Sequence, residues 1–295
     1  MLLVTFIEAG RRKLGVLDHT HREVIDLSRV APHLAQDMLT FLTLGEPARA
    51  EVHELMIAGE AHVPLSQVQL AAPIPRPARN IFCVGKNYRD HVQELQRPTS
   101  TIASKDALPE VPIFFTKAPS AVIGPNEPIP AWLDPTESTD YEGELAVVIG
   151  TGGRGIPRAE AMRHVFGYTI INDVTSRILQ GKHQQWFLGK SVDGFCPMGP
   201  AIVTADEVPE VEKLQVQTRV NGELRQDAPV SDLIFDIPVL IETLSRTMTL
   251  EPGDIIATGT PAGVGMGFKP PKYLKKGDVV AITIEPIGTL ENPVG

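Results

Sequence analysis

Three carboxylates occur where strand-like segments begin or end, in "DYEGELAVVIG" and "GYTIIND". Glu142 and Glu144 stand two positions apart, so in an extended strand their side chains project from the same face. Asp173 ends the second segment, directly before a stretch with helical spacing. Carboxylate oxygens suit Mg²⁺ or Mn²⁺, and the lack of cysteine nearby disfavours a soft metal. The alternative is that the glutamates lie on a solvated face and that Asp173 only caps a helix.

Two cations and an amide follow these carboxylates in the sequence. If "DVTSRILQ" is a helix that begins at Asp173, then Arg177 and Gln180 share its face. Arg177 can pair there with the carboxylate of an anionic substrate, or it can form a structural salt bridge. Lys190 lies between apolar residues and a Gly/Pro-rich bend in "FLGKSVDGFCPMGP", which is compatible with a partly buried amine or with a surface lysine.

A histidine and a glutamate are spaced for a short helical turn in "NYRDHVQEL". His91 and Glu94 stand three positions apart and are neighbours on a helix. A carboxylate in that position orients the imidazole and raises its basicity toward a water molecule. A surface His–Glu pair has the same spacing, so the pattern by itself leaves both interpretations open.

The glycine-rich stretch "GDIIATGTPAGVGMG" follows a strand but does not predict dinucleotide binding. Pro261 interrupts the turn, and "FKPPK" follows where a helix would have to open. We expect instead a loop that presents the Thr258 and Thr260 hydroxyls to a bound carboxylate. GxSxG, HExxH and CxxC motifs are absent from the sequence, so serine hydrolase and zinc protease mechanisms lack their parts.

The apolar pattern predicts a strand-rich protein in two domains. Residues 1–72 contain two short strands within residues 2–17 and two helical stretches, which indicate a small α+β domain. Pro73, Pro75 and Pro77 break helices, so they mark the entry to a second domain over residues 73–295. That domain is richer in strands than in helices, which favours a mixed or mainly antiparallel sandwich-like fold. The expected strands are 80–85, 112–117, 143–150, 167–173, 214–222, 253–259 and 278–290, and the expected helices are 157–165, 174–180 and 237–248.

Composition excludes several classes of partner. The net charge of −9 over 295 residues disfavours nucleic acid and anionic membranes, because neither polyanion is attracted by the overall field. Cys83 and Cys196 are too few for a disulfide framework, and their apolar surroundings are typical of reduced core cysteines. We therefore expect a cytoplasmic protein, since the sequence also has no signal-peptide pattern and no run of about 18 apolar residues.

The segments taken together resemble the fumarylacetoacetate hydrolase family. The matching segments run in family order across residues 80–265: "CVGKNYRDHVQE", "PIFFTKAPSAVIGPNEPI", "DYEGELAVVIG", "GYTIINDVTSR", "GKSVDGFCPMGP", "VNGELRQD" and "GDIIATGTPAGVG". The resemblance implies a mixed β-sandwich roll, a homodimer, and a Mg²⁺ or Mn²⁺ ion held by three carboxylates. Residues 1–72 resemble the N-terminal domain that only some members have.

The resemblance also assigns roles to residues. It implies that Glu142, Glu144 and Asp173 bind the metal and that His91 and Glu94 form a water-activating dyad on a lid. It further implies that the oxo-acid end of the substrate is held by Arg177, Gln180, Lys190 and Thr260, with Lys190 also stabilising developing negative charge. The stretch over residues 95–110, with Pro98 and Pro109, is longer than in the shortest members and affects the expected lid.

The activity implied by the resemblance is metal-dependent hydrolysis of a C–C bond in a ketonic substrate. A 2,4-dioxo acid of the acylpyruvate or fumarylpyruvate type would be cleaved to pyruvate and a carboxylic acid. The first alternative keeps the metal but changes the reaction, to decarboxylation of an oxaloacetate-type acid or isomerisation of a 2-hydroxyhepta-2,4-diene-1,7-dioate-type acid. The second alternative is a catalytically silent binding protein, which the intact set of candidate residues disfavours.

Overall fold

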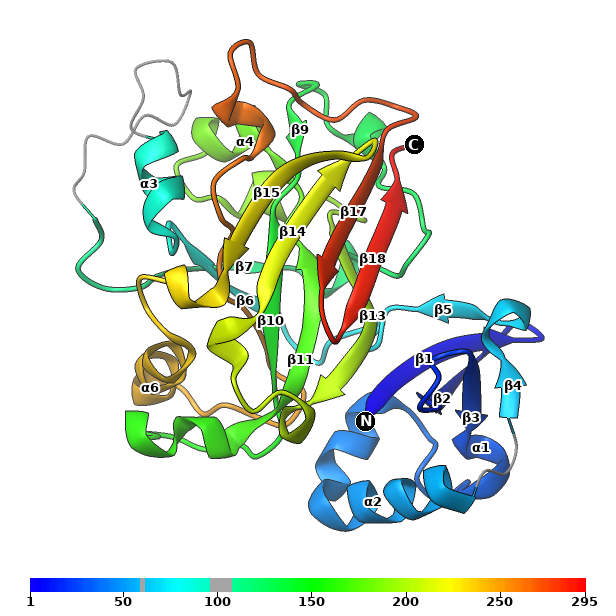
Figure 1. The fold of residues 1–295 in the computed structure, drawn as a ribbon. Helices are drawn as coiled ribbons and strands as arrows, with labels where there is room; N and C mark the ends of the chain where they lie inside the picture. The colour runs from blue at the N-terminus through cyan, green and yellow to red at the C-terminus, as the bar shows by residue number, and fades with distance from the viewer. Residues whose placement is uncertain (59–61, 96–107) are drawn as a thin grey trace.

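A computed structural model describes residues 1–58, 62–95 and 108–295, and its dominant feature is one large mixed sheet (Figure 1). Among the described residues this sheet has twelve strands, ten of them in the order β4-β3-β2-β1-β13-β11-β10-β16-β6-β7, with β5 beside β1 and β8 beside β13. The strands are β1 (Leu2–Glu8), β2 (Arg11–Leu17), β3 (Glu23–Asp26), β4 (His62–Pro64), β5 (Gln69–Ala71), β6 (Ile81–Gly85), β7 (Ile113–Lys117), β8 (Val122–Ile123), β10 (Gly143–Ile149), β11 (Val165–Asn172), β13 (Cys196–Thr204) and β16 (Ile255–Ala257).

A second, antiparallel sheet packs over the middle of the first. Its described strands run β15-β14-β17-β18 and are β14 (Gln215–Val220), β15 (Glu223–Pro229), β17 (Val279–Ile284) and β18 (Gly288–Pro293). Figure 1 shows these four strands lying in front of β10 and β11. A short pair, β9 (Thr139–Asp140) with β12 (Thr175–Ser176), joins the segments next to the candidate site. This arrangement confirms the expected mixed β-sandwich.

Strand β10 shows how the two faces of the large sheet are used. Leu145, Val147 and Ile149 belong to the core between the two sheets, whereas Ala146 and Val148 belong to the core on the opposite face. This alternation follows from the two-residue period of a strand. Because every residue of β10 is buried, a charged residue on this strand needs a partner inside the protein.

The first 72 residues continue the large sheet. Strand β1 pairs antiparallel with β13, with Leu2 opposite Val203 and Leu3 opposite Ile202. Helix α2 (Met38–Ala58) covers that part of the sheet, and the ring of Phe41 meets Phe166 edge-on at 6.4 Å. Figure 1 shows this part at the lower right, beside β13. The domain boundary at residue 72 stays a prediction. Backbone pairing between β1 and β13 joins the parts of the chain before and after it.

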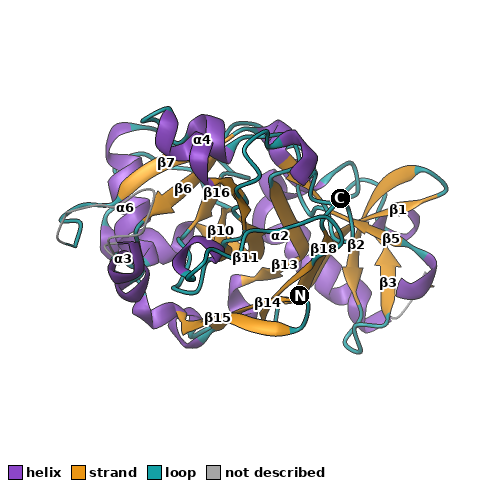
Figure 2. Ribbon diagram, turned by 90° about the horizontal axis from the view of Figure 1, so that it is seen from above, coloured by secondary structure: helices purple, strands orange, loops and turns teal. Residues whose placement is uncertain are grey.

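Helices are short and lie around the sheets, as Figure 2 shows from above. Besides α2, the described α-helices are α1 (Leu27–Val30), α3 (Arg89–Leu95), α4 (Arg177–Lys182), α5 (Phe187–Lys190) and α6 (Ile237–Thr247). The described 3₁₀ helices are η1 (Leu65–Gln67), η2 (Pro119–Ala121), η3 (Ala131–Leu133), η4 (Arg158–His164), η5 (Ala205–Glu207), η6 (Val211–Lys213), η7 (Val230–Asp232) and η8 (Gly265–Gly267). The two helical stretches expected in the first domain form one element, α2, whose backbone breaks at Gly45 with φ 69°. None of the helices in the described part of the chain is long and apolar enough to cross a membrane.

One expectation about local structure was wrong. The Gly/Pro-rich segment after Lys190 is not only a bend, because it contains β13, which pairs with β11 on one side and β1 on the other. Proline removes a ladder donor and glycine weakens a strand, so tertiary pairing overrides local preference here. The stretch expected to shape the lid, residues 95–110, lies mostly outside the described residues.

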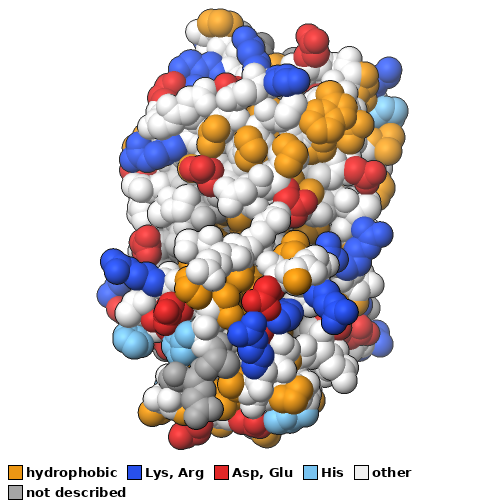
Figure 3. Space-filling model, turned by 90° about the vertical axis from the view of Figure 1, so that its right-hand side faces the viewer, with side chains coloured by type: hydrophobic (Ala, Val, Ile, Leu, Met, Phe, Trp, Pro, Cys, Tyr) orange, Lys and Arg blue, Asp and Glu red, His pale blue; other side chains and the backbone are white. Residues whose placement is uncertain are grey.

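On the surface, positively and negatively charged side chains are interspersed over the face shown in Figure 3.

Candidate active site and metal centre

Glu142, Glu144 and Asp173 converge in the structure. One ligand oxygen from each lies within 4.8 Å of the others, and all three side chains are buried. Glu144 lies on β10, whereas Glu142 precedes that strand and is not part of it. The backbone N–H of Asp173 donates to the carbonyl of Glu142 at 2.8 Å, which joins the end of β11 to the start of β10. This junction places three carboxylates in one buried spot.

Two buried lysines neutralise part of this charge. Lys190 Nζ donates to Glu142 Oε2 at 2.7 Å and to Asp173 Oδ2 at 2.6 Å. Lys117 Nζ donates to Asp173 Oδ1 at 2.7 Å and to the carbonyl of Val174 at 3.0 Å. Sequence reasoning missed Lys117, which ends β7 with its side chain fully buried. The available signal was a lysine at the end of an apolar strand, which does not distinguish a buried cation from an exposed one.

Arg177 bonds to carboxylates of the protein itself. Its Nε donates to Asp140 Oδ2 at 2.8 Å and its Nη1 to Glu142 Oε1. Its Nη2 is buried and has no hydrogen-bond partner among the described residues. Arg177 therefore forms the structural salt bridge and still has one donor available for a ligand.

The helix expected from Asp173 begins four residues later. Helix α4 starts at Arg177, because Thr175 and Ser176 are extended and pair with β9. The predicted spacing from Asp173 was therefore wrong, although Arg177 and Gln180 are both buried at the site. They come together as neighbours three positions apart on α4, with Arg177 Nη1 3.5 Å from Gln180 Oε1.

The glycine-rich loop binds protein carboxylates through its backbone. Gly259 N–H donates to Glu144 Oε2 at 2.8 Å, and Gly263 N–H lies 3.2 Å from both carboxylate oxygens of Glu94. At Gly263 φ is +106°, and a Cβ would lie 1.8 Å from the carbonyl oxygen of Arg225. Glycine is required there, because an L side chain would meet both backbone strain and a clash.

The two threonines of this loop, Thr258 and Thr260, have different hydrogen-bond partners and different positions relative to the cavity. Thr258 donates its hydroxyl to the carbonyl of Leu145 at 2.9 Å and does not line the cavity, so its expected ligand contact was wrong. Thr260 lines the cavity, donates to the carbonyl of Gly143 at 3.0 Å and accepts from the Gln226 amide at 2.7 Å. Its contact with a substrate stays a prediction.

His91 and Glu94 lie together on α3, over the carboxylate cluster. His91 Nδ1 is 3.2 Å from Glu94 Oε2, and both side chains are buried. Glu94 is held from the other side by Gly263, so the pair is fixed by helix and loop together. A proton on Nδ1 would be shared with Glu94 and would leave Nε2 free to accept a proton.

The two glutamates titrate in opposite directions. Burial alone would raise the pKa of Glu142, but the Lys190 ammonium and the Arg177 guanidinium hold it well below its usual range. Burial, together with the charges of Asp173 and Glu142, raises the pKa of Glu144 well above its usual range. With Glu144 ionised, the cluster would carry more negative charge than its neighbours neutralise, so the raised pKa favours the protonated form of Glu144 in the absence of a cation.

The donor set fits a divalent cation that prefers oxygen ligands. Among the described residues four buried carboxylates face three buried cations: Asp140, Glu142, Glu144 and Asp173 against Lys117, Arg177 and Lys190. A cation of charge two would keep Glu144 ionised at neutral pH. Ligands that are all carboxylate oxygens are typical of Mg²⁺ and Mn²⁺, and they do not choose between the two.

A small cavity of about 30 Å³ connects His91 of the dyad with the cluster. Its lining includes His91, Glu142, Glu144, Lys190, Arg177, Gln180 and Thr260. Phe115 and Trp186 form an aromatic wall, with ring centroids 5.2 Å apart. Of the residues to which the resemblance assigns roles, Asp173 and Glu94 do not line this cavity, but they contact Lys190 and His91, which do.

A mixed β-sandwich with a buried acidic triad defines the general class, and comparison with known proteins defines the family. The sequence model described as "Fumarylacetoacetate (FAA) hydrolase C-terminal" matches residues 80–295. The chain is 56% identical over 231 residues to oxaloacetate tautomerase YisK of Bacillus subtilis strain 168, covering 78% of this chain and 74% of that protein. The chain therefore belongs to the fumarylacetoacetate hydrolase family, which is a family of enzymes.

Solved structures agree with this assignment. A fumarylacetoacetate hydrolase from the psychrophile Exiguobacterium antarcticum is 43% identical, with a TM-score of 0.83, over 100% of this chain and 99% of that one. A maleylpyruvate hydrolase from Sphingobium sp. SYK-6, solved with manganese(II) and pyruvate, is 33% identical, with a TM-score of 0.79, over 100% of this chain and 98% of that one. Both cover the N-terminal part as well as the catalytic sheet.

Proposed function

We propose that this chain is a divalent-metal-dependent enzyme that interconverts the keto and enol forms of oxaloacetate or of a closely related 2-oxo acid. The observation that carries this proposal is a cavity of about 30 Å³ that is lined by one oriented imidazole, His91, and by Glu142 and Glu144 of the carboxylate cluster. The 56% identity to an oxaloacetate tautomerase supports the substrate class. Keto–enol interconversion needs a group that moves a proton from carbon to oxygen and a site that stabilises an enolate, and it breaks no carbon–carbon bond.

The chain would divide these tasks among its own residues. Glu142, Glu144 and Asp173 would hold Mg²⁺ or Mn²⁺, which when bound supplies Lewis-acid stabilisation of negative charge on the 2-oxo oxygen. Arg177 Nη2, which has no partner among the described residues, would bind the substrate carboxylate together with the Gln180 amide, and Thr260 would join them once its hydroxyl turns from the carbonyl of Gly143. These contacts fix the orientation of a small acid in the cavity.

His91 would carry the proton between carbon and oxygen. With its Nδ1 proton held by Glu94, its Nε2 removes a proton from C3 of the keto acid, and the electron pair moves onto the 2-oxo oxygen. Lys190, held in place by Glu142 and Asp173, keeps a positive charge beside the enolate as it forms. Return of the proton to the enolate oxygen completes the enol, and the reverse sequence regenerates the ketone.

Hydrolysis of an acylpyruvate is the second candidate, and the same dyad favours it. His91 would deprotonate a water molecule that attacks the C4 carbonyl of a 2,4-dioxo acid, and the C3–C4 bond then breaks. The products are a carboxylic acid and a pyruvate enolate, which takes up a proton to give pyruvate. The similarity to a maleylpyruvate hydrolase that binds manganese and pyruvate supports this candidate. Decarboxylation of oxaloacetate and isomerisation of a hydroxydienoic diacid would use the same enolate-stabilising groups.

One assay series separates these candidates. Decay of enol oxaloacetate is followed by its absorbance with Mg²⁺, with Mn²⁺ and with a chelator, while pyruvate is measured in parallel. Faster metal-dependent decay without pyruvate is the expected result, and His91→Gln should slow it by about 100-fold. Pyruvate from acylpyruvates would select hydrolysis, pyruvate from oxaloacetate would select decarboxylation, and an absorbance change with only a diene diacid would select isomerisation.

Two further expectations stay proposals. We infer a homodimer from the family, and light scattering after size-exclusion chromatography would test it. We also infer a cytoplasmic location, which fractionation of the source cells would test. Neither inference enters the argument for the reaction.

A further inference from the structure

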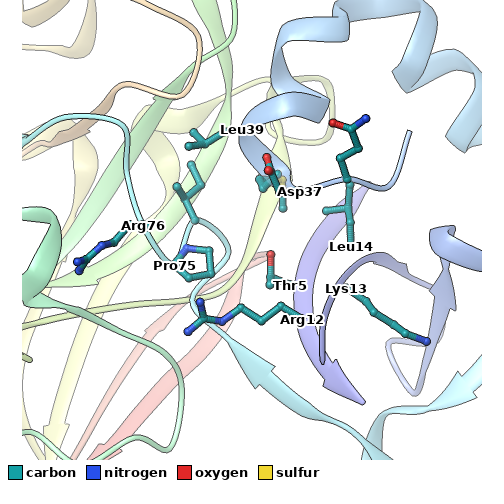
Figure 4. Close-up of a pocket in the computed structure, with 11 residues that line it drawn as sticks. Thr5, Arg12, Lys13, Leu14, Asp37, Leu39, Pro75 and Arg76 are labelled. Atoms are coloured by element: carbon teal, nitrogen blue, oxygen red, sulfur yellow. The ribbon is translucent and has the colours of Figure 1, made fainter. Parts of the chain in front are cut away.

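A second cavity lies far from the catalytic carboxylates, where the N-terminal strands meet the segment that leads into the catalytic sheet. Its volume is about 190 Å³, and Figure 4 shows the side chains around it. The lining comes from three places: β1 and β2, the start of α2, and residues 74–76. Neither the proposed metal ligands nor the dyad contributes to it.

The floor of this cavity is apolar. Leu14, Met38 and Ile74 line it and are each at most 2% exposed in the folded chain, and Leu39 and Pro75 add further apolar surface. The one polar side chain in the floor, Thr5, already donates its hydroxyl to the carbonyl of Pro73 at 2.7 Å. An occupant of the floor would therefore be held by removal of apolar surface from water.

The rim of the cavity carries two arginines whose guanidiniums are unpaired among the described residues. Arg12 and Arg76 are exposed, and neither guanidinium makes a hydrogen bond or an ion pair with any described residue. Lys13, the third cation of the lining, is already paired with Glu8 at 2.6 Å and Asp26 at 2.9 Å, and Figure 4 shows it pointing away from the other lining residues. Arg12 and Arg76 therefore have no partner of this kind to give up when an anion binds.

The remaining charged residue of the lining limits where an anion can lie. Asp37 accepts a hydrogen bond from the backbone N–H of Thr40 at 2.8 Å and keeps its negative charge at the start of α2. Figure 4 shows Asp37 on the side of the cavity opposite Arg76. An anionic group would therefore bind on the side of Arg12 and Arg76, away from that carboxylate.

We propose that this cavity binds a small amphipathic carboxylic acid, with the apolar part on Leu14, Met38 and Ile74 and the carboxylate at Arg12 and Arg76. An apolar floor with a few convergent polar groups is the usual composition of a small-molecule site. The planar guanidinium is the side chain best suited to grip a carboxylate through two parallel hydrogen bonds. This site is independent of the proposed catalytic function.

Binding of hexanoate, measured by isothermal titration calorimetry, tests the proposal. Hexanamide has the same chain without the charge, and acetate has the charge without the chain. Hexanoate should bind the wild-type protein, and each of the other two should bind at least about tenfold more weakly, because each lacks half of the recognition. Equal binding of hexanoate and hexanamide, or no hexanoate binding up to about 20 mM, would overturn the proposal.

Substitution of the two arginines locates the site. The double variant Arg12→Gln with Arg76→Gln should bind hexanoate about tenfold more weakly, because both charge-assisted contacts are lost. Arg11→Gln is the matched control, since Arg11 is the exposed neighbour on β2 and does not line the cavity. Both changes are at exposed positions, so the fold should be retained. Unchanged hexanoate affinity in the double variant would place the ligand elsewhere and contradict the proposal.

Discussion

Charged side chains are used in opposite ways at the proposed metal-binding carboxylates and at the N-terminal cavity. Lys117 is fully buried and donates to Asp173, to Val174 and to the carbonyl of Lys190. Arg12 and Arg76 lie at an exposed rim, and their guanidiniums have no hydrogen-bond partner among the described residues. Burying a charge is costly unless it is paired, whereas an exposed charge is solvated by water and needs no partner. The comparison teaches that the buried cations hold the site together and that the rim cations remain available to a ligand.

The largest expected effect is loss of activity when a buried carboxylate is neutralised. Asp173→Asn removes one proposed metal ligand and leaves two ammonium groups without their shared partner, so metal-dependent turnover should fall by about 1000-fold or more. Turnover and Mn²⁺ affinity are measured together. Asp193→Asn, at an exposed position nearby, is the control and should leave both unchanged. Wild-type Mn²⁺ affinity in Asp173→Asn would refute the metal role.

Removal of a buried cation should cost stability. Lys117→Met leaves Asp173 with one fewer ion-pair partner in a buried site, so the free energy of unfolding of the metal-free protein should fall by about 3–5 kcal/mol. Bound Mn²⁺ should recover part of this loss, because it binds the folded state and compensates the same carboxylate. Urea unfolding with and without metal measures both effects. Lys182→Met, on the exposed side of α4, should stay within about 0.5 kcal/mol of wild type.

The carboxylate of Asp18, in the N-terminal part, should make the free energy of unfolding depend on pH. Burial alone would raise the pKa of Asp18, but hydrogen bonds from Thr20, Glu23 and Arg22 hold this pKa well below its usual range. A lowered folded-state pKa means that the stabilisation is present above the unfolded pKa of about 3.9 and is lost as pH falls below it. Asp18→Asn should therefore lower the free energy of unfolding by about 1–2 kcal/mol at pH 7, and by less at pH 3. A constant gap between the two proteins from pH 7 to pH 3 would refute the assignment.

The smallest expected effect is the change in stability when the two rim arginines are replaced, and it tests the contrast between rim cations and buried cations. The double variant Arg12→Gln with Arg76→Gln should change the free energy of unfolding by no more than about 0.5 kcal/mol, because neither guanidinium has a partner to lose among the described residues. Urea unfolding measures this alongside Lys117→Met. A loss as large as that expected for Lys117→Met would show that the rim arginines have a structural role.

Part of the candidate site is readable from local sequence. The three-residue spacing of His91 and Glu94 predicts neighbours because a helix has a fixed period. The two-residue spacing of Glu142 and Glu144 also predicts neighbours, and the two carboxylates are close although Glu142 lies just before β10. The glycine-rich loop is recognisable as a loop, since Pro261 prevents the helix that a dinucleotide site would need. These features depend on residues close in sequence.

Other features depend on contacts between distant residues and were not readable. Strand β13 contains glycine and proline but is a strand because β11 and β1 pair with its two edges. Asp140 looked like an ordinary polar residue before a strand, yet it accepts from Arg177 and from the backbone of Gly265 and Met266. Such pairings join positions from 27 residues apart, as for Ile171 with Met198, to 201 residues apart, as for Leu2 with Val203, and no local period encodes them.

The sequence by itself determined the strand-rich fold class and the family, and it predicted Glu142, Glu144, Asp173 and His91 for the candidate site. Only the tertiary structure decided how the buried charge is balanced: Lys117 and Asp140 enter the cluster, Arg177 binds the protein as well as leaving a donor free, and Glu144 is left undercompensated. The physical reason is that a side chain's type and spacing fix its chemistry and local direction, whereas its partners and its desolvation depend on which distant segments the fold brings against it.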